Sequence, residues 1–256
     1  MLRETSNTRG AIIFDGDDTL WETQAIYDRA KEHFYHLMGQ QGFNECAVKE
    51  KFGQVDAENV KTMGFSMHRF PRSMQDVYKY FCIQNNYTID PAICDQILRI
   101  GYSVFDNEPV LMPGARDVLE QLSKLYDLYL FTSGDLEIQK RKLAQVKILP
   151  FFRKSFIKER KDESELSNII ESEALDIKRS WMIGNSPRSD INPALKVGLR
   201  CIWIRGGTWE YDEEILVEGQ VWAVSSLLEI PSILLEADYS HTLSKAVGNS
   251  NISSTQ

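Results

Sequence analysis

Short apolar runs that stop at polar clusters constrain the fold of this chain more than any other feature of its sequence. Residues 11–14 (AIIF) run directly into residues 15–19 (DGDDT). The same change from apolar to polar follows residues 128–131 (LYLF) and residues 180–183 (SWMI), and a fourth apolar run occupies residues 200–204 (RCIWI). A short apolar run with such an abrupt end is typical of a strand buried on both faces of a parallel sheet. The sequence therefore predicts four such strands.

Helical segments separate these strands. Pro113-Gly114 opens a helix over residues 115–125, and a second helical segment lies near residues 164–173. Strands that alternate with helices indicate right-handed crossovers and a parallel sheet covered on both faces. We therefore expect an α/β fold, in which ligands bind at the carboxyl ends of the strands.

One long segment, residues 22–108, departs from this alternation. It contains successive amphipathic helical stretches and no convincing strand. The stretches are residues 24–38, 47–61, 73–83 and 91–105. The segment is therefore predicted to be an all-helical domain inserted after the first strand.

The composition excludes several classes of protein. Of the 256 residues, 43% are apolar and 26% are charged, which is typical of a globular chain rather than of a disordered or fibrous one. The net charge of −8 disfavours binding to nucleic acid or to an anionic membrane. No apolar run is long enough to span a bilayer, and the N-terminus lacks the pattern of a signal peptide. The four cysteines form no CxxC pair, so we expect reduced thiols and a cytoplasmic protein.

Polar side chains are predicted to meet where the strands end. Asp15 and Asp17 follow the first strand, Thr132 the second, and Asn185 and Asp190 the third. Two carboxylates two residues apart in extended backbone point to the same side and repel, so one must be protonated or a cation must neutralise them. Oxygen ligands without a nearby Cys or His cluster favour Mg²⁺ over zinc.

Four segments together resemble a known family. The segments FDGDDTLW, LFTSG, the single Lys161 and IGNSPRSDI occur in the order of the four motifs of the haloacid dehalogenase-like hydrolase superfamily. The resemblance spans the chain. It implies a Rossmann-like, doubly wound catalytic core made of residues 1–21 and 109–240, with residues 22–108 as a helical cap. Residues 241–256 are expected to be a disordered tail.

The resemblance also implies roles for single residues. Asp15 resembles the nucleophile that attacks phosphorus and forms an aspartyl-phosphate, and Asp17 the general acid and then base. Thr132 and Ser133 resemble the motif that binds the phosphoryl group, and Lys161 the cation that neutralises it. Other basic residues lie nearby, but the spacing to the third strand selects Lys161 over Lys154, Lys158 and Arg160.

The expected metal site departs from the family pattern. The resemblance implies that Mg²⁺ is held by Asp15, by the backbone carbonyl of Asp17 and by an acid after the third strand. The family has an acid directly after the glycine of that motif, whereas here Gly184 is followed by Asn185. We expect Asp190 to be a ligand, with Asn185 either a ligand through its amide oxygen or the group that orients Asp190. Fewer carboxylates predict weaker Mg²⁺ binding.

Two further positions are left open. Residue 18 is Asp where the family commonly has Gly, and we assign it no role. Residues 64–73 (GFSMHRFPRS) interleave basic and aromatic side chains within the cap. This segment has two possible interpretations. It is either a segment that closes over the leaving group or an ordinary interhelical turn with solvated arginines.

The sequence therefore predicts a Mg²⁺-dependent phosphatase that acts on a small phosphorylated metabolite, with no nucleic-acid or membrane partner. A haloacid dehalogenase needs no leaving-group acid, so Asp17 argues against it. A phosphotransferase or mutase shares every core residue. A signalling receiver domain would carry its phosphoacceptor on a later strand. Because Asn185 stands where the family has an acid, a catalytically weak member that binds a phosphorylated ligand or a protein is also a possible interpretation.

Overall fold

The core of the protein is a six-stranded parallel sheet. The computed structural model describes residues 9–206 and 218–237. The strands lie in the order β3-β2-β1-β4-β5-β6, and every neighbouring pair is parallel. They are β1 (Ala11–Phe14), β2 (Asp127–Ser133), β3 (Lys154–Lys158), β4 (Trp181–Gly184), β5 (Arg200–Ile204) and β6 (Val221–Val224). The α/β class predicted from the sequence is confirmed. The tail predicted for residues 241–256 lies outside the described residues.

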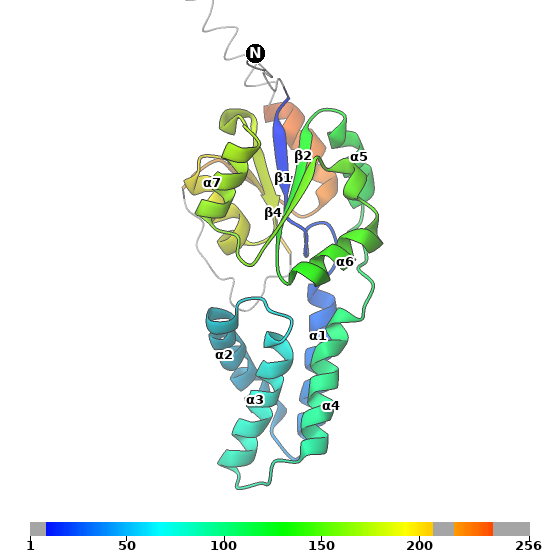
Figure 1. Ribbon diagram of the computed structural model, residues 1–256, viewed down its shortest axis with the longest axis vertical. Coiled ribbons are helices and arrows are strands. Elements are labelled where there is room, and N and C mark those ends of the chain that lie inside the picture. Colours follow the sequence, from blue (N-terminus) through cyan, green and yellow to red (C-terminus); the bar gives the residue numbers. More distant parts are fainter. Residues whose placement is uncertain (1–8, 207–217, 238–256) are drawn as a thin grey trace, which may run out of the picture.

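Helices cover both faces of this sheet, as the period of two in the strands requires. On one face, Ile12 and Phe14 of β1 belong to an apolar cluster with α5 (Ala115–Ser123) and α6 (Leu136–Val146). On the other face, Ile13 packs in a second cluster with α7 (Glu163–Ser172) and α8 (Asn192–Lys196). Figure 1 shows α5 and α6 on one side of the sheet and α7 on the other. The doubly wound arrangement expected for the core is therefore present.

The two edge strands and the helix α6 were not predicted from the sequence. Among the described residues, no strand lies on the outer edge of β3, so its side chains are only partly buried or exposed. Its lysines also made this segment resemble a solvated basic run. The other edge strand, β6, is also only partly buried. An edge strand lacks the continuous apolar signal on which the prediction of central strands depends.

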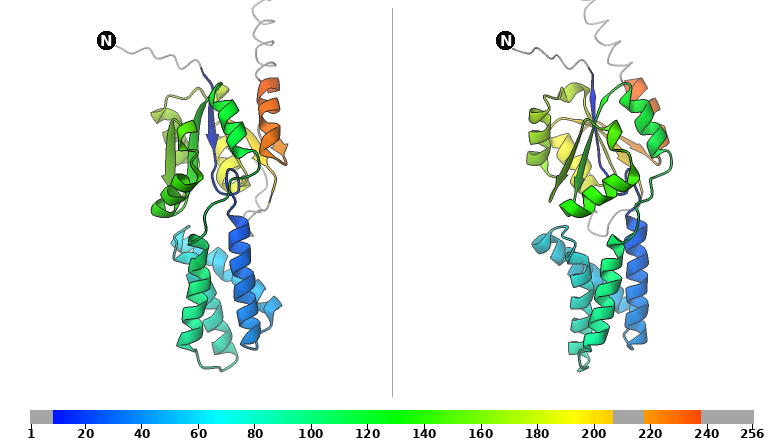
Figure 2. Two further views of the ribbon diagram at one scale, coloured as in Figure 1. Left: turned by 90° about the vertical axis from the view of Figure 1, so that its right-hand side faces the viewer. Right: turned by 45° about the vertical axis from the view of Figure 1, so that its right-hand side comes forward.

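Residues 24–105 form a helical bundle with an apolar core of its own. Its helices are α1 (Gln24–Gln40), α2 (Glu45–Met63), α3 (Arg69–Gln84) and α4 (Pro91–Tyr102), followed by a short turn of 3₁₀-helix, η1 (Ser103–Phe105). Phe34, Phe52 and Met74 lie in the bundle's cluster, which is separate from the two clusters that flank the sheet. Figures 1 and 2 show the bundle extending from the end of the sheet, connected to the core before α1 and after α4.

Within the described residues, none of the helices has the length and apolar character needed to cross a bilayer.

Candidate active site

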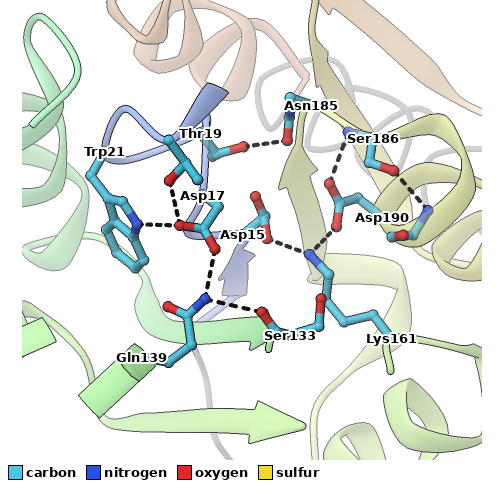
Figure 3. A network of polar contacts seen from close by, with 12 residues as sticks. Asp15, Asp17, Thr19, Trp21, Ser133, Gln139, Lys161, Asn185, Ser186 and Asp190 are labelled. Atoms are coloured by element: carbon cyan, nitrogen blue, oxygen red, sulfur yellow. Dashed lines mark hydrogen bonds and ion pairs between the residues drawn. The ribbon is translucent and has the colours of Figure 1, made fainter. Parts of the chain in front are cut away.

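The carboxyl ends of the central strands bring the motif residues together. Phe14, the last residue of β1, pairs with Leu130 of β2 and with Ile183 of β4. The pairing continues one residue further, where the amide of Asp15 donates to the carbonyl of Ile183 at 2.8 Å. Residues that follow the three strands therefore face one another (Figure 3).

Lys161 joins two of these carboxylates. Its ammonium group contacts one oxygen of Asp15 and one oxygen of Asp190 (Figure 3). The exposed fraction is 4% for the side chain of Lys161, 5% for that of Asp15 and 0% for that of Asp190. The second oxygen of Asp190 accepts a hydrogen bond from the amide of Ser186 at 2.9 Å. The sequence prediction that Lys161, Asp15 and Asp190 lie together is therefore matched by the geometry.

Burial and charge set the ionisation of this trio. Burial, and to a lesser degree the neighbouring Asp190 carboxylate, raise the pKa of Asp15 to about 7, although Lys161 opposes both effects. Burial alone would lower the pKa of Lys161, but the carboxylates of Asp15 and Asp190 outweigh it and raise that pKa. The lysine is therefore held as a cation, whereas the Asp15 carboxylate needs positive charge close by to remain ionised near neutral pH.

The absence of a side chain at Gly184 allows Asp190 to lie over the end of β4. A Cβ atom at Gly184 would overlap the Asp190 carboxylate. Asp190 lies in η4 (Pro187–Ile191), a single π-helical turn that begins just after the strand. Such turns are frequent at functional sites. Here the turn directs Asp190 back toward Lys161.

Asn185 is held by contacts from two distant segments. Its amide oxygen accepts a hydrogen bond from the Thr19 hydroxyl at 3.3 Å, and its backbone carbonyl accepts one from the Trp203 indole at 2.9 Å. The side chain is 5% exposed. Asn185 therefore presents its amide oxygen near the strand ends, next to the first motif.

Asp17 has an environment very different from that of Asp15. One of its oxygens accepts from the Trp21 indole, the Thr23 hydroxyl and the Lys142 ammonium, each at 2.6 Å, and the other accepts from the Gln139 amide at 2.6 Å. Burial by itself would raise the pKa of Asp17, but Lys142 and these hydrogen bonds outweigh it and lower that pKa. The structure therefore holds Asp17 as a carboxylate.

Gln139 and Lys142 are site residues that the sequence analysis missed. Both lie on α6, which the sequence reading did not identify. Asp135 caps this helix by accepting from the amides of Glu137 and Ile138 at 3.1 and 3.3 Å. An Asp followed by an apolar-periodic segment is a helix-start signal, so it was available in the sequence. The contacts of Gln139 and Lys142 with Asp17 could not be predicted from the sequence, because they join residues more than a hundred positions apart.

Asp18 has a structural role that the sequence analysis did not assign. Its backbone has a φ of 59°, in the left-handed region where Gly is the usual residue. Its carboxylate accepts from the amides of Thr23 and Gln24, each at 2.8 Å, at the start of α1. Burial raises the pKa of Asp18 to about 6, although these two hydrogen bonds oppose the rise. Asp18 therefore anchors the first helix of the bundle to the motif.

Thr132 supplies a hydroxyl that has no partner among the described residues. The residue is 1% exposed and its Oγ1 makes no hydrogen bond there. Its neighbour Ser133 contributes its carbonyl, which accepts from the Gln139 amide at 3.0 Å. A buried hydroxyl without a partner is costly, and an oxygen-rich ligand in front of it would remove that cost.

A cavity of about 590 Å³ lies between the core and the helical bundle. The core side presents Asp15, Asp17, Thr132, Ser133, Lys161, Asn185 and Asp190, and the bundle side includes Gly64, Phe65, Ser66 and Arg69. The interpretation of the segment 64–73 as a solvated turn is wrong for Arg69, which is 3% exposed. It is right for Arg72, which is exposed and paired with Asp76. The segment thus faces the motif residues across the cavity.

The donor atoms at the cavity floor fit a hard cation. The available oxygens belong to the carboxylates of Asp15 and Asp190, the amide of Asn185 and the backbone of Asp17. No group of three or more His, Cys, Asp or Glu side chains that could hold a metal occurs within residues 9–206 and 218–237. Mg²⁺ commonly takes one or two carboxylates and completes its coordination with water and phosphate oxygens, so this donor set suits Mg²⁺ better than zinc.

Two curated proteins share sequence similarity with the chain. A pyrimidine 5'-nucleotidase, PynA of Streptococcus pneumoniae (strain ATCC BAA-255 / R6), is 27% identical over 125 residues, which cover 46% of this chain and 53% of PynA. The match thus spans about half the length of PynA. The HAD-hydrolase YfnB of Bacillus subtilis (strain 168) is 25% identical over 228 residues, or 87% of this chain and 95% of YfnB.

Solved structures show the same fold. A haloacid dehalogenase-like family hydrolase from Xanthomonas campestris has a TM-score of 0.76 at 24% identity, covering 91% of this chain and 93% of its own. YfnB bound to magnesium has a TM-score of 0.62 at 21% identity, with coverages of 88% and 98%. A 2-haloacid dehalogenase from Pseudomonas syringae pv. tomato DC3000 has a TM-score of 0.55 at 18% identity, with coverages of 90% and 99%.

The arrangement of four ordered motifs at the end of a doubly wound sheet agrees with a family model. The model for haloacid dehalogenase-like hydrolases matches residues 12–204, which include every motif residue placed above. The chain therefore belongs to the haloacid dehalogenase-like hydrolase family.

Proposed function

We propose that this hydrolase is a Mg²⁺-dependent phosphatase that cleaves a small phosphomonoester through an aspartyl-phosphate on Asp15. One observation carries the proposal. The buried carboxylate of Asp15, the buried Lys161 and the Thr132 hydroxyl, which has no partner in the described part of the chain, line one cavity together with a second carboxylate, Asp17. These groups are the nucleophile, the charge-stabilising groups and the proton carrier that phosphoryl transfer to a carboxylate requires.

Asp15, Asp190, Asn185 and the backbone carbonyl of Asp17 would hold the magnesium ion in this proposal. When bound, the ion would supply positive charge that favours the ionised form of Asp15 and offsets the charge of the phosphoryl oxygens. The magnesium-bound structure of YfnB supports this choice of metal. The Thr19 contact to Asn185 fits either a ligand oxygen or a group that orients Asp190.

In the first half-reaction, the Asp15 carboxylate forms a bond to phosphorus while the bond between phosphorus and the leaving oxygen breaks. Lys161 and the Thr132 hydroxyl stabilise the phosphoryl oxygens, and Asp17 gives a proton to the leaving oxygen. Asp17 must therefore be protonated at this stage. Because Lys142 favours the ionised form, protonation requires that the contact between Asp17 and Lys142 be broken.

In the second half-reaction, Asp17 takes a proton from water as the water oxygen bonds to phosphorus. The bond between phosphorus and Asp15 breaks, so phosphate is released and both carboxylates return to their starting state. The four hydrogen bonds to Asp17 keep it ionised until the proton arrives, and the contact with Lys142 must again be broken when Asp17 takes up the proton.

In this proposal the helical bundle acts as a cap over a small phosphorylated metabolite. The cavity supports this role because residues of the bundle and of the core line it together. The similarity to PynA, a pyrimidine 5'-nucleotidase, supports a phosphomonoester substrate. We also propose a cytoplasmic protein, because its four cysteines are free, as is usual in a reducing compartment.

A haloacid dehalogenase is the second candidate. Asn185 favours it, because an amide in place of an acid weakens a magnesium site, and a 2-haloacid dehalogenase shares the fold. In addition, Lys161 is the one cation of the described residues that contacts both Asp15 and Asp190. Dehalogenation releases halide without a leaving-group acid, so it gives no role to the hydrogen-bonded Asp17. We therefore favour the phosphatase.

The test measures release of phosphate from a panel of phosphomonoesters, with Mg²⁺ and after its removal by chelation, together with release of chloride from 2-chloropropionate. The proteins are the wild type, Asp15→Asn and the matched control Asp95→Asn, which neutralises an exposed acid on α4. We expect Mg²⁺-dependent phosphate release that Asp15→Asn abolishes and Asp95→Asn preserves. Chloride release without metal would replace the phosphatase with the second candidate.

A further inference from the structure

A buried arginine faces the motif residues from the bundle side of the cavity. Arg69 is the first residue of α3, it lines the cavity, and it is 3% exposed. One of its terminal nitrogens, Nη1, contacts an oxygen of Asp56 on α2, whose side chain is 9% exposed. Burial of a charged pair costs free energy that an apolar pair would not, so this pair calls for a functional explanation.

The contact with Asp56 leaves part of the guanidinium unused. Among the described residues, the Nε of Arg69 has no hydrogen-bond partner. A buried N–H of a charged group that lacks an acceptor is destabilising, and such groups are rare in native proteins. Because Asp56 already balances the charge of Arg69, the group that best fits the unpaired N–H is a neutral hydrogen-bond acceptor and not a second anion.

Three aromatic side chains lie on the bundle side of the cavity with Arg69, together with Val60, Lys61 and Ser66. Tyr27, Phe65 and Phe105 line the same cavity, and the centre of the Phe65 ring lies 5.9 Å from the Arg69 guanidinium carbon. The rings of Tyr27 and Phe105 are 6.5 Å apart, edge to face. Among the described residues of the bundle, no acid lines the cavity. Aromatic side chains next to the buried N–H donor of Arg69 suit a flat ring that carries an acceptor oxygen.

We propose that Arg69 is a specificity-determining residue whose Nε–H donates a hydrogen bond to an acceptor oxygen on the leaving group. This inference rests on the proposed phosphatase function and names its substrate class. The class is a phosphomonoester of an alcohol that bears a planar ring with a carbonyl oxygen, the chemistry of a pyrimidine nucleoside monophosphate. The ring lies against the aromatic walls, while the phosphoryl group reaches Asp15 on the opposite side of the cavity.

The experiment compares uridine 5'-monophosphate with ribose 5-phosphate. Both substrates release a primary 5'-alcohol, but only the first carries a ring with carbonyl oxygens. We measure the ratio of kcat/KM for the two substrates in the wild type, in Arg69→Lys and in the double variant Asp56→Asn with Arg69→Met. Lysine keeps a cation next to Asp56 but lacks the Nε–H, and the double variant leaves no unpaired charge. Thermal unfolding shows which variants fold.

We expect the wild type to prefer uridine 5'-monophosphate, and the ratio to fall about ten- to hundredfold when the hydrogen bond is lost. Arg72→Met, an exposed change on the same helix, is the matched control and should keep the wild-type ratio. A wild-type ratio near one, or an unchanged ratio in the folded Arg69 variants, would overturn the role of Arg69 while leaving the phosphatase intact.

A binding measurement separates this inference from the function on which it rests. Calorimetry with Asp15→Asn, alone and combined with Arg69→Lys, compares the affinities for the same two compounds without turnover. If no phosphomonoester is hydrolysed but Arg69→Lys still removes a preference for the ring compound, the phosphatase proposal fails and the recognition role stands. If neither hydrolysis nor preferential binding is found, both proposals fall.

Discussion

The two sides of the cavity, core and bundle, use buried ion pairs in different ways. On the core side, Lys161 lies between Asp15 and Asp190, and in our proposal this charge surrounds the reacting atoms. On the bundle side, Arg69 is balanced by Asp56 and surrounded by aromatic rings. In our proposals, the sheet side of the cavity carries out the chemistry and the helical side selects the leaving group.

A second contrast lies within the core side itself. Asp15 and Asp17 are separated by a single glycine, yet burial raises the pKa of Asp15 to about 7, whereas Lys142 and three hydrogen bonds outweigh burial and lower the pKa of Asp17. Environments that push two pKa values apart are a common way to give two carboxyl groups different roles. The predictions below test both contrasts, and the largest expected effect comes first.

Asp17→Asn tests the division of labour between the two acids. We expect kcat to fall about 10² to 10⁴-fold, the usual contribution of a positioned acid and base. Any aspartyl-phosphate that forms should persist, because no base activates the water that removes it. The measurement is steady-state turnover together with labelled phosphate retained on the denatured protein. Glu22→Gln, an exposed change nearby, should behave as wild type. Wild-type turnover in Asp17→Asn would remove this residue from the mechanism.

Lys161→Met tests whether charge on the core side drives the chemistry. We expect kcat to fall about 10² to 10³-fold, the effect of losing one preorganised stabilising group. The half-exposed Lys158, paired with Glu165, is the matched control, and Lys158→Met should retain nearly full activity. Turnover is compared on proteins whose fold is verified by circular dichroism. If the two variants lost activity equally, the assignment of Lys161 over its basic neighbours would be wrong.

Asn185→Asp tests the departure from the family pattern in the third motif. A third carboxylate strengthens binding of a hard cation, so the Mg²⁺ concentration for half-maximal activity should fall several-fold. A Mg²⁺ titration of activity provides the measurement. Asn168→Asp adds the same charge on the exposed face of α7 and should not shift the titration. If the Mg²⁺ concentration for half-maximal activity were unchanged or higher in Asn185→Asp, Asn185 would be excluded from the metal site.

Asp18→Asn should change stability rather than chemistry. Because burial raises the pKa of Asp18 from 3.8 to about 6, the folded protein binds more protons than the unfolded chain in this interval, and wild-type stability falls as pH rises through it. Asn does not ionise, so its stability advantage over the wild type should be about 1 to 2 kcal/mol larger at pH 8 than at pH 5. Urea denaturation at both pH values measures it. If the wild type and Asp18→Asn differed in free energy of unfolding by the same amount at pH 5 and pH 8, the Asp18 carboxylate would not be destabilised by burial.

Much of the fold follows from local signals in the chain. The central strands were predictable because burial on both faces demands continuous apolar runs, and the polar residues after them had to meet because parallel strands end at one edge. The strands β3 and β6 were not predicted because, within residues 9–206 and 218–237, each has a neighbouring strand on one side only and is less buried. The order of the motifs was enough to indicate Asp15, Thr132, Lys161 and Asp190.

The sequence by itself determined the family, the α/β fold and the order in which the motif residues occur, because these depend on short-range apolar periodicity and on strand direction. Only the tertiary structure decided how each side chain is used. The hydrogen bonds to Asp17 from α6 and the contact between Thr19 and Asn185 join segments far apart in the chain. Whether Arg69 is solvated or buried likewise depends on how the helices pack. Ionisation and hydrogen-bonding capacity follow burial and neighbouring charge, and these exist only after the chain has folded.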